Sequence, residues 1–166
     1  MANTRINLNG VRLTFMNIEG AINKTVGTRT KGRFNQNGAR DFAIQLSEEQ
    51  AEAMKRDGFN VKWPKPNPEI PEEEDTRLPT LSVTVSNNAN IHPSVRVFVV
   101  QGTDPNDPGV VLDHSNYAQL DDMDILYADV NINVNDWNVN GNSGRKCYLN
   151  AMKVYIREIG FGESTY

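Results

Sequence analysis

Apolar and polar residues alternate along two segments between Asp129 and Arg157. In both segments every second residue is apolar, namely Val130, Ile132 and Val134, then Met152, Val154 and Ile156. This period of two predicts a β-hairpin whose strands each have one buried and one exposed face. The exposed face of the second strand would carry Lys153, Tyr155 and Arg157. Positions 138–144 are rich in Asn and Gly, which predicts a long flexible loop between the strands.

Shorter segments with strand-like patterns precede this hairpin. They lie at positions 11–16, 40–46, 59–63, 81–85, 95–100 and 110–112. One short helix is predicted after Ser47, which forms a capping box with Gln50, and Gly58 ends it. The acidic residues Glu48 and Glu49 suit its first turn.

These elements predict an all-β fold with one short helix. The pattern favours an OB-fold-like barrel, the oligonucleotide-binding type, elaborated with long loops and a C-terminal β-hairpin. With 166 residues the chain is expected to form a single domain over positions 1–166. We expect a basic loop at 20–40, a proline-rich and acidic loop at 64–80, and a short C-terminal tail at 160–166.

Charge is distributed unevenly along the chain. The net charge is −4, but positions 1–65 carry a net +5 and positions 66–166 a net −9. Local fields attract phosphates within a Debye length of about 8–10 Å, so a basic groove on an acidic body remains compatible with this total. The composition therefore excludes a wholly basic nucleic-acid coat but not a nucleic-acid interface.

Cys147 is the single cysteine, which excludes an internal disulfide framework and suits a reducing compartment. No apolar run approaches the roughly 18 residues of a membrane span, and no signal peptide is visible at the first residues. We therefore expect a soluble, cytoplasmic protein with no membrane partner.

Signals for catalysis are weak. His92 and His114 both lie in turn contexts, and neither has the spacing of a zinc site with Cys147. We expect no enzyme, no catalytic residue, no cofactor and no metal site. One alternative stays open, a Mg²⁺-dependent nuclease that uses Asp122, Asp124 and Asp129.

Aromatic and basic residues occur together in three neighbourhoods. These are Arg33-Phe34 with Arg40-Phe42, Lys62-Trp63 with Lys65, and Trp137 with Arg145, Lys146 and Tyr148. A surface that combines rings with positive charge can stack bases and hold phosphates at the same time. A binding module for single strands is therefore the better-supported interpretation.

Five blocks of the chain form a recognisable set, namely Val11–Phe15, Arg33–Phe42, Asp57–Lys62, Asp136–Gly141 and Gly144–Leu149. In this order they resemble a family of small phage and prophage single-stranded DNA-binding proteins. The resemblance implies an OB-fold barrel, no catalysis, and cooperative coating of single-stranded DNA without sequence specificity. It also implies a role in DNA replication or recombination within the host cell cytoplasm.

The candidate DNA-binding residues come from two arguments. The resemblance favours Arg33, Phe34, Arg40, Trp137, Arg145, Lys146 and Tyr148. Charge and ring patterns add Lys24, Arg29, Lys31, Lys62, Lys153, Tyr155 and Arg157. Within this set, the predicted loop from Trp137 to Tyr148 ranks first and the strand face of Lys153, Tyr155 and Arg157 second.

The expected partners are single-stranded DNA, further copies of the chain in a dimer or a filament on DNA, and phage or host replication and recombination proteins. The tail after position 160 has one acid, so the four acids Glu72–Asp75 are an alternative element for recruiting proteins. A non-enzymatic virion protein with protein-binding β surfaces is the other open interpretation. Neither DNA over RNA preference nor oligomeric state follows from the sequence.

Overall fold

The computed structural model describes residues 4–22, 24–26, 29–31, 40–85, 95–113 and 116–157. Its elements in chain order are β1 (Thr4–Val11), β2 (Leu13–Asn17), β3 (Lys24–Val26), β4 (Arg29–Lys31), β5 (Asp41–Gln45), α1 (Glu48–Arg56), β6 (Val61–Lys62), the 3₁₀ helix η1 (Glu72–Glu74), β7 (Thr80–Thr84), β8 (Arg96–Gln101), β9 (Val110–Leu112), the 3₁₀ helix η2 (Tyr117–Asp122), β10 (Ile125–Val139) and β11 (Asn142–Ile156). Strands dominate, which confirms the predicted class.

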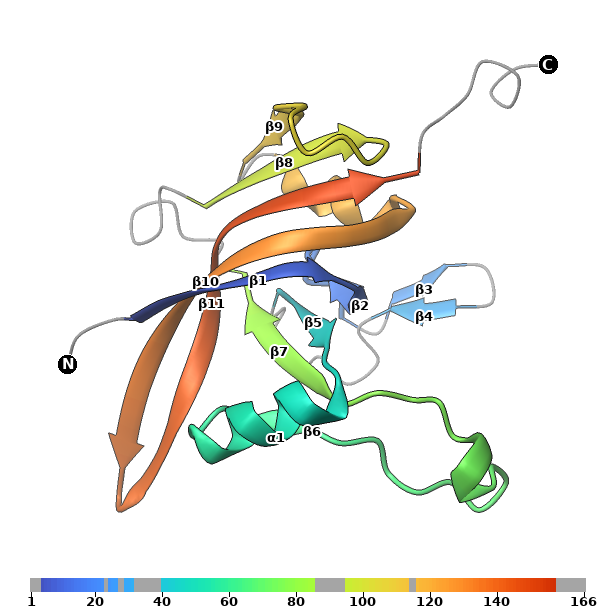
Figure 1. Cartoon of the computed structure of the whole chain (residues 1–166). Coiled ribbons are helices and arrows are strands. Elements are labelled where there is room, and N and C mark those ends of the chain that lie inside the picture. Colours follow the sequence, from blue (N-terminus) through green and yellow to red (C-terminus); the bar gives the residue numbers. More distant parts are fainter. Residues whose placement is uncertain are drawn as a thin grey trace.

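The principal sheet is mixed, and its main path runs β1-β10-β11-β7-β5-β2 (Figure 1). β8 joins β11 in parallel, β9 follows β8, and β6 pairs with β7. In the described residues β1 and β2 stand at opposite ends of this path without pairing, so the OB-fold-like architecture is an open mixed sheet and not a closed barrel. Only Arg12 separates the two strands in sequence, so one continuous segment supplies both ends of an open sheet.

The hairpin of β10 and β11 is longer and its turn tighter than the sequence predicted. Pairing continues from Ile125–Ile156 to Val139–Asn142, so no long loop is present at 138–144. Asn140 and Gly141 form the turn with φ values of 52° and 82°, the positive angles that a two-residue Asn-Gly turn requires. Figure 1 shows the far end of this hairpin reaching past the rest of the sheet, near α1.

The core lies on one face of the curved sheet. The alternating apolar residues of the hairpin are buried there, with Leu149 and residues of β5, β7 and β8. Tyr117 and Leu120 of η2 are also fully buried against this core. The opposite face of β1, β10 and β11 therefore carries the polar half of each alternation.

The predicted helix is confirmed as α1. Ser47 accepts a hydrogen bond from the backbone N–H of Gln50, and the Gln50 side chain accepts one from the Ser47 backbone. Ala51 is the fully buried residue of the helix. The chain then passes through Gly58 and the buried Phe59 to the short strand β6, which is all that remains of the strand predicted at 59–63.

Two segments of the structure differ from the prediction. Part of the basic segment at 20–40 forms a two-stranded ribbon of β3 and β4 instead of a loop throughout. β1 was not predicted, although Ile6 and Leu8 alternate with Arg5 and Asn7 in the manner of a strand.

Candidate nucleic-acid interface

The register of the hairpin places Trp137, Lys146 and Tyr148 on one face. Trp137 is opposite Gly144, Asn135 opposite Lys146, and Asn133 opposite Tyr148. Opposed residues of an antiparallel pair share a face, and alternate residues of one strand do too. We call this surface the outer face, and its members are Arg5, Asn7, Asn131, Asn133, Asn135, Trp137, Gly144, Lys146, Tyr148 and Asn150.

Trp137 lies across the hairpin over Gly144. A Cβ built on Gly144 would lie 2.8 Å from Trp137 Cζ2, so the indole occupies the space that a side chain would take. Trp137 is nevertheless 44% exposed. A ring fixed by backbone on one side and open to solvent on the other is a suitable platform for stacking.

Lys146 and Tyr148 form a cation–π pair beside this platform. The Lys146 Nζ lies 5.3 Å from the centroid of the Tyr148 ring. Lys146 is exposed and Tyr148 half-buried, so the ammonium group is accessible to a phosphate while the ring supports it. Charge and ring are thus combined at one place, as the sequence predicted.

A chain of side-chain amides continues the outer face towards β1. Arg5 Nε donates to Asn133 Oδ1 at 3.0 Å, and Asn131 Nδ2 donates to Asn7 Oδ1 at 2.6 Å. Asn150, at the bulge of β11, connects the two pairs because its Nδ2 donates to Asn131 at 2.8 Å and its Oδ1 accepts from Asn133 at 3.4 Å. These linked amides hold one another in place and leave further donors available at the surface.

A hollow of about 240 Å³ lies at the end of this amide chain. Its lining residues are Asn7, Asn9, Phe98, Asp129, Val130, Asn131, Ala151, Met152 and Lys153. Phe98 supplies an aromatic wall, and Asp129 is held by the backbone N–H of Gly10 at 2.8 Å. Rings therefore lie at both ends of this surface, Trp137 on the outer face and Phe98 in the adjoining hollow, with the linked amides between them.

Arg145, predicted with this cluster, lies on the opposite face of the hairpin. Its Nε donates to Asp136 at 2.9 Å, and its guanidinium lies 4.6 Å from the centroid of the buried Phe59 ring. Arg145 also forms an isolated backbone bridge with Phe59. These contacts attach the hairpin to the segment after α1. Arg145 therefore connects parts of the fold and does not belong to the outer face.

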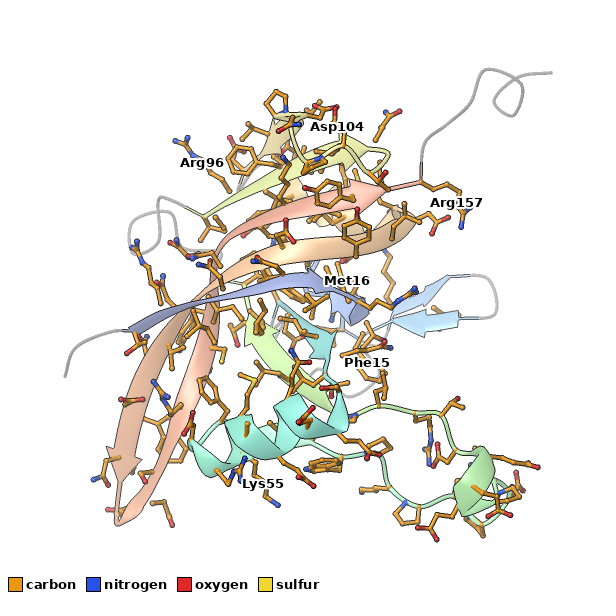
Figure 2. The ribbon with its side chains drawn as sticks, viewed as in Figure 1. Phe15, Met16, Lys55, Arg96, Asp104 and Arg157 are labelled. Carbon is orange, nitrogen blue, oxygen red and sulfur yellow. The ribbon has the colours of Figure 1, made fainter. Side chains whose placement is uncertain are left out.

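The second-ranked strand face is largely covered. Tyr155 is only 3% exposed and stacks on Tyr127 with ring centroids 4.8 Å apart, so its predicted exposed position is wrong. Lys153 donates to the carbonyl of Pro105 at 2.8 Å, in the loop between β8 and β9. Arg157 is exposed but pairs with Asp124 at 2.6 Å. Figure 2 shows Arg157 at the end of β11 and Arg96, an exposed cation, at the start of β8.

The remaining predicted cations lie elsewhere. Lys24 pairs with Glu19 at 2.8 Å, and Arg40 donates to the carbonyl of Ile18 at 3.3 Å. Burial raises the pKa of the Asp41 carboxyl, and nearby Lys62 opposes that rise. Arg29 and Lys31 belong to β4, whereas Arg33 and Phe34 lie outside the described residues.

The acids of the nuclease alternative do not form a common site. Asp124 pairs with Arg157, Asp129 accepts from the backbone N–H of Gly10, and Asp122 is the last residue of η2. Across the part of the chain that the structure describes, no group of three His, Cys, Asp or Glu residues is placed to hold a metal ion. The geometry thus gives this alternative no support.

Sequence reasoning missed several members of the outer face and its hollow. These are Arg5, Asn7, Asn131, Asn133, Asn150 and Phe98. A signal was present, because asparagines recur at alternate positions 7 and 9 and again at 131, 133 and 135. Repeated amides on one face of a strand pair were interpreted only as solvated polar positions.

Comparisons with known proteins give a family and a similar fold. A family model described as a putative phage ssDNA-binding domain matches residues 2–163. The fold is similar to that of the C-terminally truncated single-stranded DNA-binding protein from bacteriophage Enc34, with a TM-score of 0.50, 10% identity, and coverage of 95% of this chain and 88% of that one. The Enc34 protein in complex with ssDNA gives a TM-score of 0.43 at 10% identity, covering 95% and 89%. No curated protein matches the chain in sequence.

None of the helices in the described ranges is long and apolar enough to cross a membrane.

Proposed function

The chain belongs to the family of putative phage ssDNA-binding domains, and on this premise we propose that it binds single-stranded DNA along the outer face of β1, β10 and β11. The binding is independent of sequence and involves no catalysis. It serves phage DNA replication or recombination in the cytoplasm of the host. This assignment is favoured over a virion role because the family model describes DNA binding.

One observation carries the proposal, the common orientation of Trp137, Lys146 and Tyr148. Hairpin register directs the three side chains to the same side, and none of them is fully buried. Two rings are available to stack bases at about 1–3 kcal/mol each, and the ammonium group between them is available to a phosphate. Arg5 adds a second cation on the neighbouring strand, opposite Asn133.

The amide chain explains why binding would be independent of sequence. Side-chain amides both donate and accept, so Asn7, Asn131 and Asn133 can contact phosphates, sugars and the edges of any base. These asparagines hydrogen-bond to one another. Their amides are therefore not positioned to recognise one particular base. Stacking on Trp137 and Tyr148 is equally tolerant because every base has an aromatic face.

The acidic total charge of the protein limits where DNA can bind. The sequence pI is about 5.2, so a phosphate backbone is repelled by most of the surface and attracted only where cations are accessible. Binding should therefore weaken steeply with salt, with a log–log slope of about −0.7 per phosphate contact. Cooperative coating, as a dimer or as a filament on DNA, belongs to the same proposal.

Protein recruitment through the acidic segment is a further part of the proposal. The three glutamates of η1, Glu72–Glu74, are exposed. The Arg77 guanidinium donates hydrogen bonds to the Asp75 carboxylate, which lowers the pKa of Asp75 to about 2. The three glutamates are thus the accessible charges of this segment. Pull-downs of replication and recombination proteins with Glu72, Glu73 and Glu74 changed to Gln test this role, and unchanged capture would contradict it.

The experiment that tests the main proposal is a titration of fluorescently labelled oligo-dT at several salt concentrations. We expect binding at micromolar protein or below, weaker binding to duplex, and a decrease in affinity with salt. Incubation with Mg²⁺ should leave the strand intact. Absence of oligo-dT binding at low salt would contradict the proposal.

A further inference from the structure

Phe15 has a backbone conformation that aromatic residues rarely adopt. It lies in β2 with φ of +52°, in the left-handed region, where a bulky side chain crowds its own backbone. Burial does not compensate for this strain, because the side chain is 73% exposed. Residues held in such conformations cluster at functional sites, since the surrounding structure must maintain them.

A bulge in β2 produces this conformation. Thr14 pairs with Ala43 and Asn17 with Asp41, so Phe15 and Met16 together face the single residue Phe42. The extra residue turns the Phe15 ring outward while Met16 packs partly against the core and Ile18 is fully buried. Figure 2 shows Phe15 and Met16 on this strand.

The segment after the bulge is fixed to the body of the protein. Asn17 Oδ1 accepts from the backbone N–H of Ala21 at 2.8 Å, and Asn17 Nδ2 donates to the Ala21 carbonyl at 3.2 Å. The Asp121 carboxylate accepts the N–H groups of Ile18 and Glu19. These bonds maintain the bulge, so the ring is displayed from a rigid base.

A two-stranded ribbon of β3 and β4 follows β2 in the chain. Lys24 begins β3 and pairs with Glu19, which connects the ribbon to the segment that follows β2. Arg29 and Lys31 belong to the partner strand β4. The exposed Lys24 is therefore a cation on the segment that continues from β2 (Figure 1).

The bulge also argues against a protein partner that would add a β-strand to this edge of the sheet. β2 ends the path of the sheet within the described residues, so its free side is where an added strand would pair. A bulge with a positive φ interrupts the ladder and blocks such addition. A flat, exposed ring on a rigid base instead fits an unpaired nucleobase, which can stack on it.

We propose that Phe15 is a second base-stacking contact for single-stranded DNA, separate from the outer face. This inference rests on the proposed function and extends its site to the β2 edge. Stacking on a protruding ring requires a base that is free of its partner, so the contact favours single strands over duplex.

The experiment compares oligo-dT affinity and salt dependence for wild type, Phe15→Gly, Phe15→Trp and Trp137→Ala. Glycine adopts positive φ freely, so Phe15→Gly should melt at or above the wild-type temperature. It should lower affinity about tenfold with an unchanged salt slope, because a ring and not a cation is removed. Phe15→Trp should restore affinity. Val110→Ala, a control on β9 whose side chain is 68% exposed, should bind as wild type.

The outcomes separate this inference from the proposed function. Wild-type protein that does not bind contradicts the proposed function itself. Wild-type binding that is weakened in Trp137→Ala but unchanged in Phe15→Gly overturns the Phe15 contact alone. A Phe15→Gly protein with altered salt slope, or with altered oligomeric state at unchanged affinity, overturns it too. Phe15→Asn, which tolerates the left-handed region, replaces Phe15→Gly if that variant does not fold, with the same outcomes.

Discussion

Trp137 occupies the space above Gly144, directly opposite it in the hairpin, where a Cβ would lie 2.8 Å from the indole ring. The glycine thus determines where the ring lies. Because Gly144 pairs with Trp137 on the outer face, the orientation of the candidate stacking platform depends on the absence of a side chain at a neighbouring position.

Gly144→Ala should therefore displace the Trp137 ring. We expect oligo-dT affinity to fall towards that of Trp137→Ala, a loss of about 1–3 kcal/mol. Trp137 emission, measured in a Trp63→Phe background, should shift to the red as the ring becomes more solvated. Ser143→Ala, at the next position but on the other face, is the control. Unchanged emission and affinity in Gly144→Ala would show that the ring is not fixed by this contact.

Lys146→Ala should reduce the salt dependence of binding. If the Lys146 ammonium holds one phosphate, the log–log slope should become less steep by about 0.7. Lys55→Ala, in the last turn of α1 and away from the outer face, removes the same charge and should leave the slope unchanged. Equal slopes in Lys146→Ala and wild type would exclude a phosphate contact at this residue.

The sequence predicted the elements well because its apolar periodicity is strong. The hairpin and the strands β7, β8 and β9 follow an alternation of apolar and polar residues, and the helix follows its capping residues. Whether the sheet closes could not be predicted, because closure depends on pairing between β1 and β2, which no local pattern encodes. The long loop predicted for the hairpin was wrong, since many asparagines around positions 138–144 obscured the Asn140-Gly141 pair that makes the turn.

The candidate site was predictable in kind but not in placement. Trp137, Lys146 and Tyr148 were identified from their residue types, and the register puts them together. Arg145 is next to Lys146 in sequence, so alternation alone sends it to the opposite face. The bulge at Phe15 was invisible, because β2 carries an ordinary strand pattern and the extra residue appears only against its partner β5.

Asn131→Ala should destabilise the fold while leaving the salt slope unchanged. It removes hydrogen bonds to Asn7 and Asn150, the centre of the amide chain. Each such bond contributes about 0.5–1.5 kcal/mol, so we expect about 1–2 kcal/mol less stability in urea unfolding. Asn60→Ala, at an exposed position before β6, should have no effect. Equal urea midpoints of unfolding for Asn131→Ala and wild type would contradict a structural role of the linked amides.

Cys147 should be unreactive at neutral pH. Burial raises the pKa of the Cys147 thiol to about 11, and nearby Arg145 opposes that rise only in part. The folded pKa lies above the unfolded value of about 8.5, so the folded state retains its proton more strongly. This contribution to stability is fully present below about pH 8.5 and is lost as the pH rises towards 11.

Two measurements check this thiol. Reaction with a disulfide reagent at pH 8 should be slow in the folded protein and fast in denaturant. The free energy of unfolding should decrease between about pH 8.5 and pH 11, and less so in Cys147→Ala. Rapid labelling of the folded protein at pH 8 would show that the thiol is accessible.

The most direct test of the outer face as the DNA site is the affinity of Trp137→Ala and Tyr148→Ala, alone and combined, for labelled oligo-dT at fixed salt. We predict that each ring removed lowers affinity by about 1–3 kcal/mol and that the double variant loses both contributions, with melting temperatures near that of wild type. If the folded double variant binds oligo-dT as tightly as wild type, the strand does not follow this face.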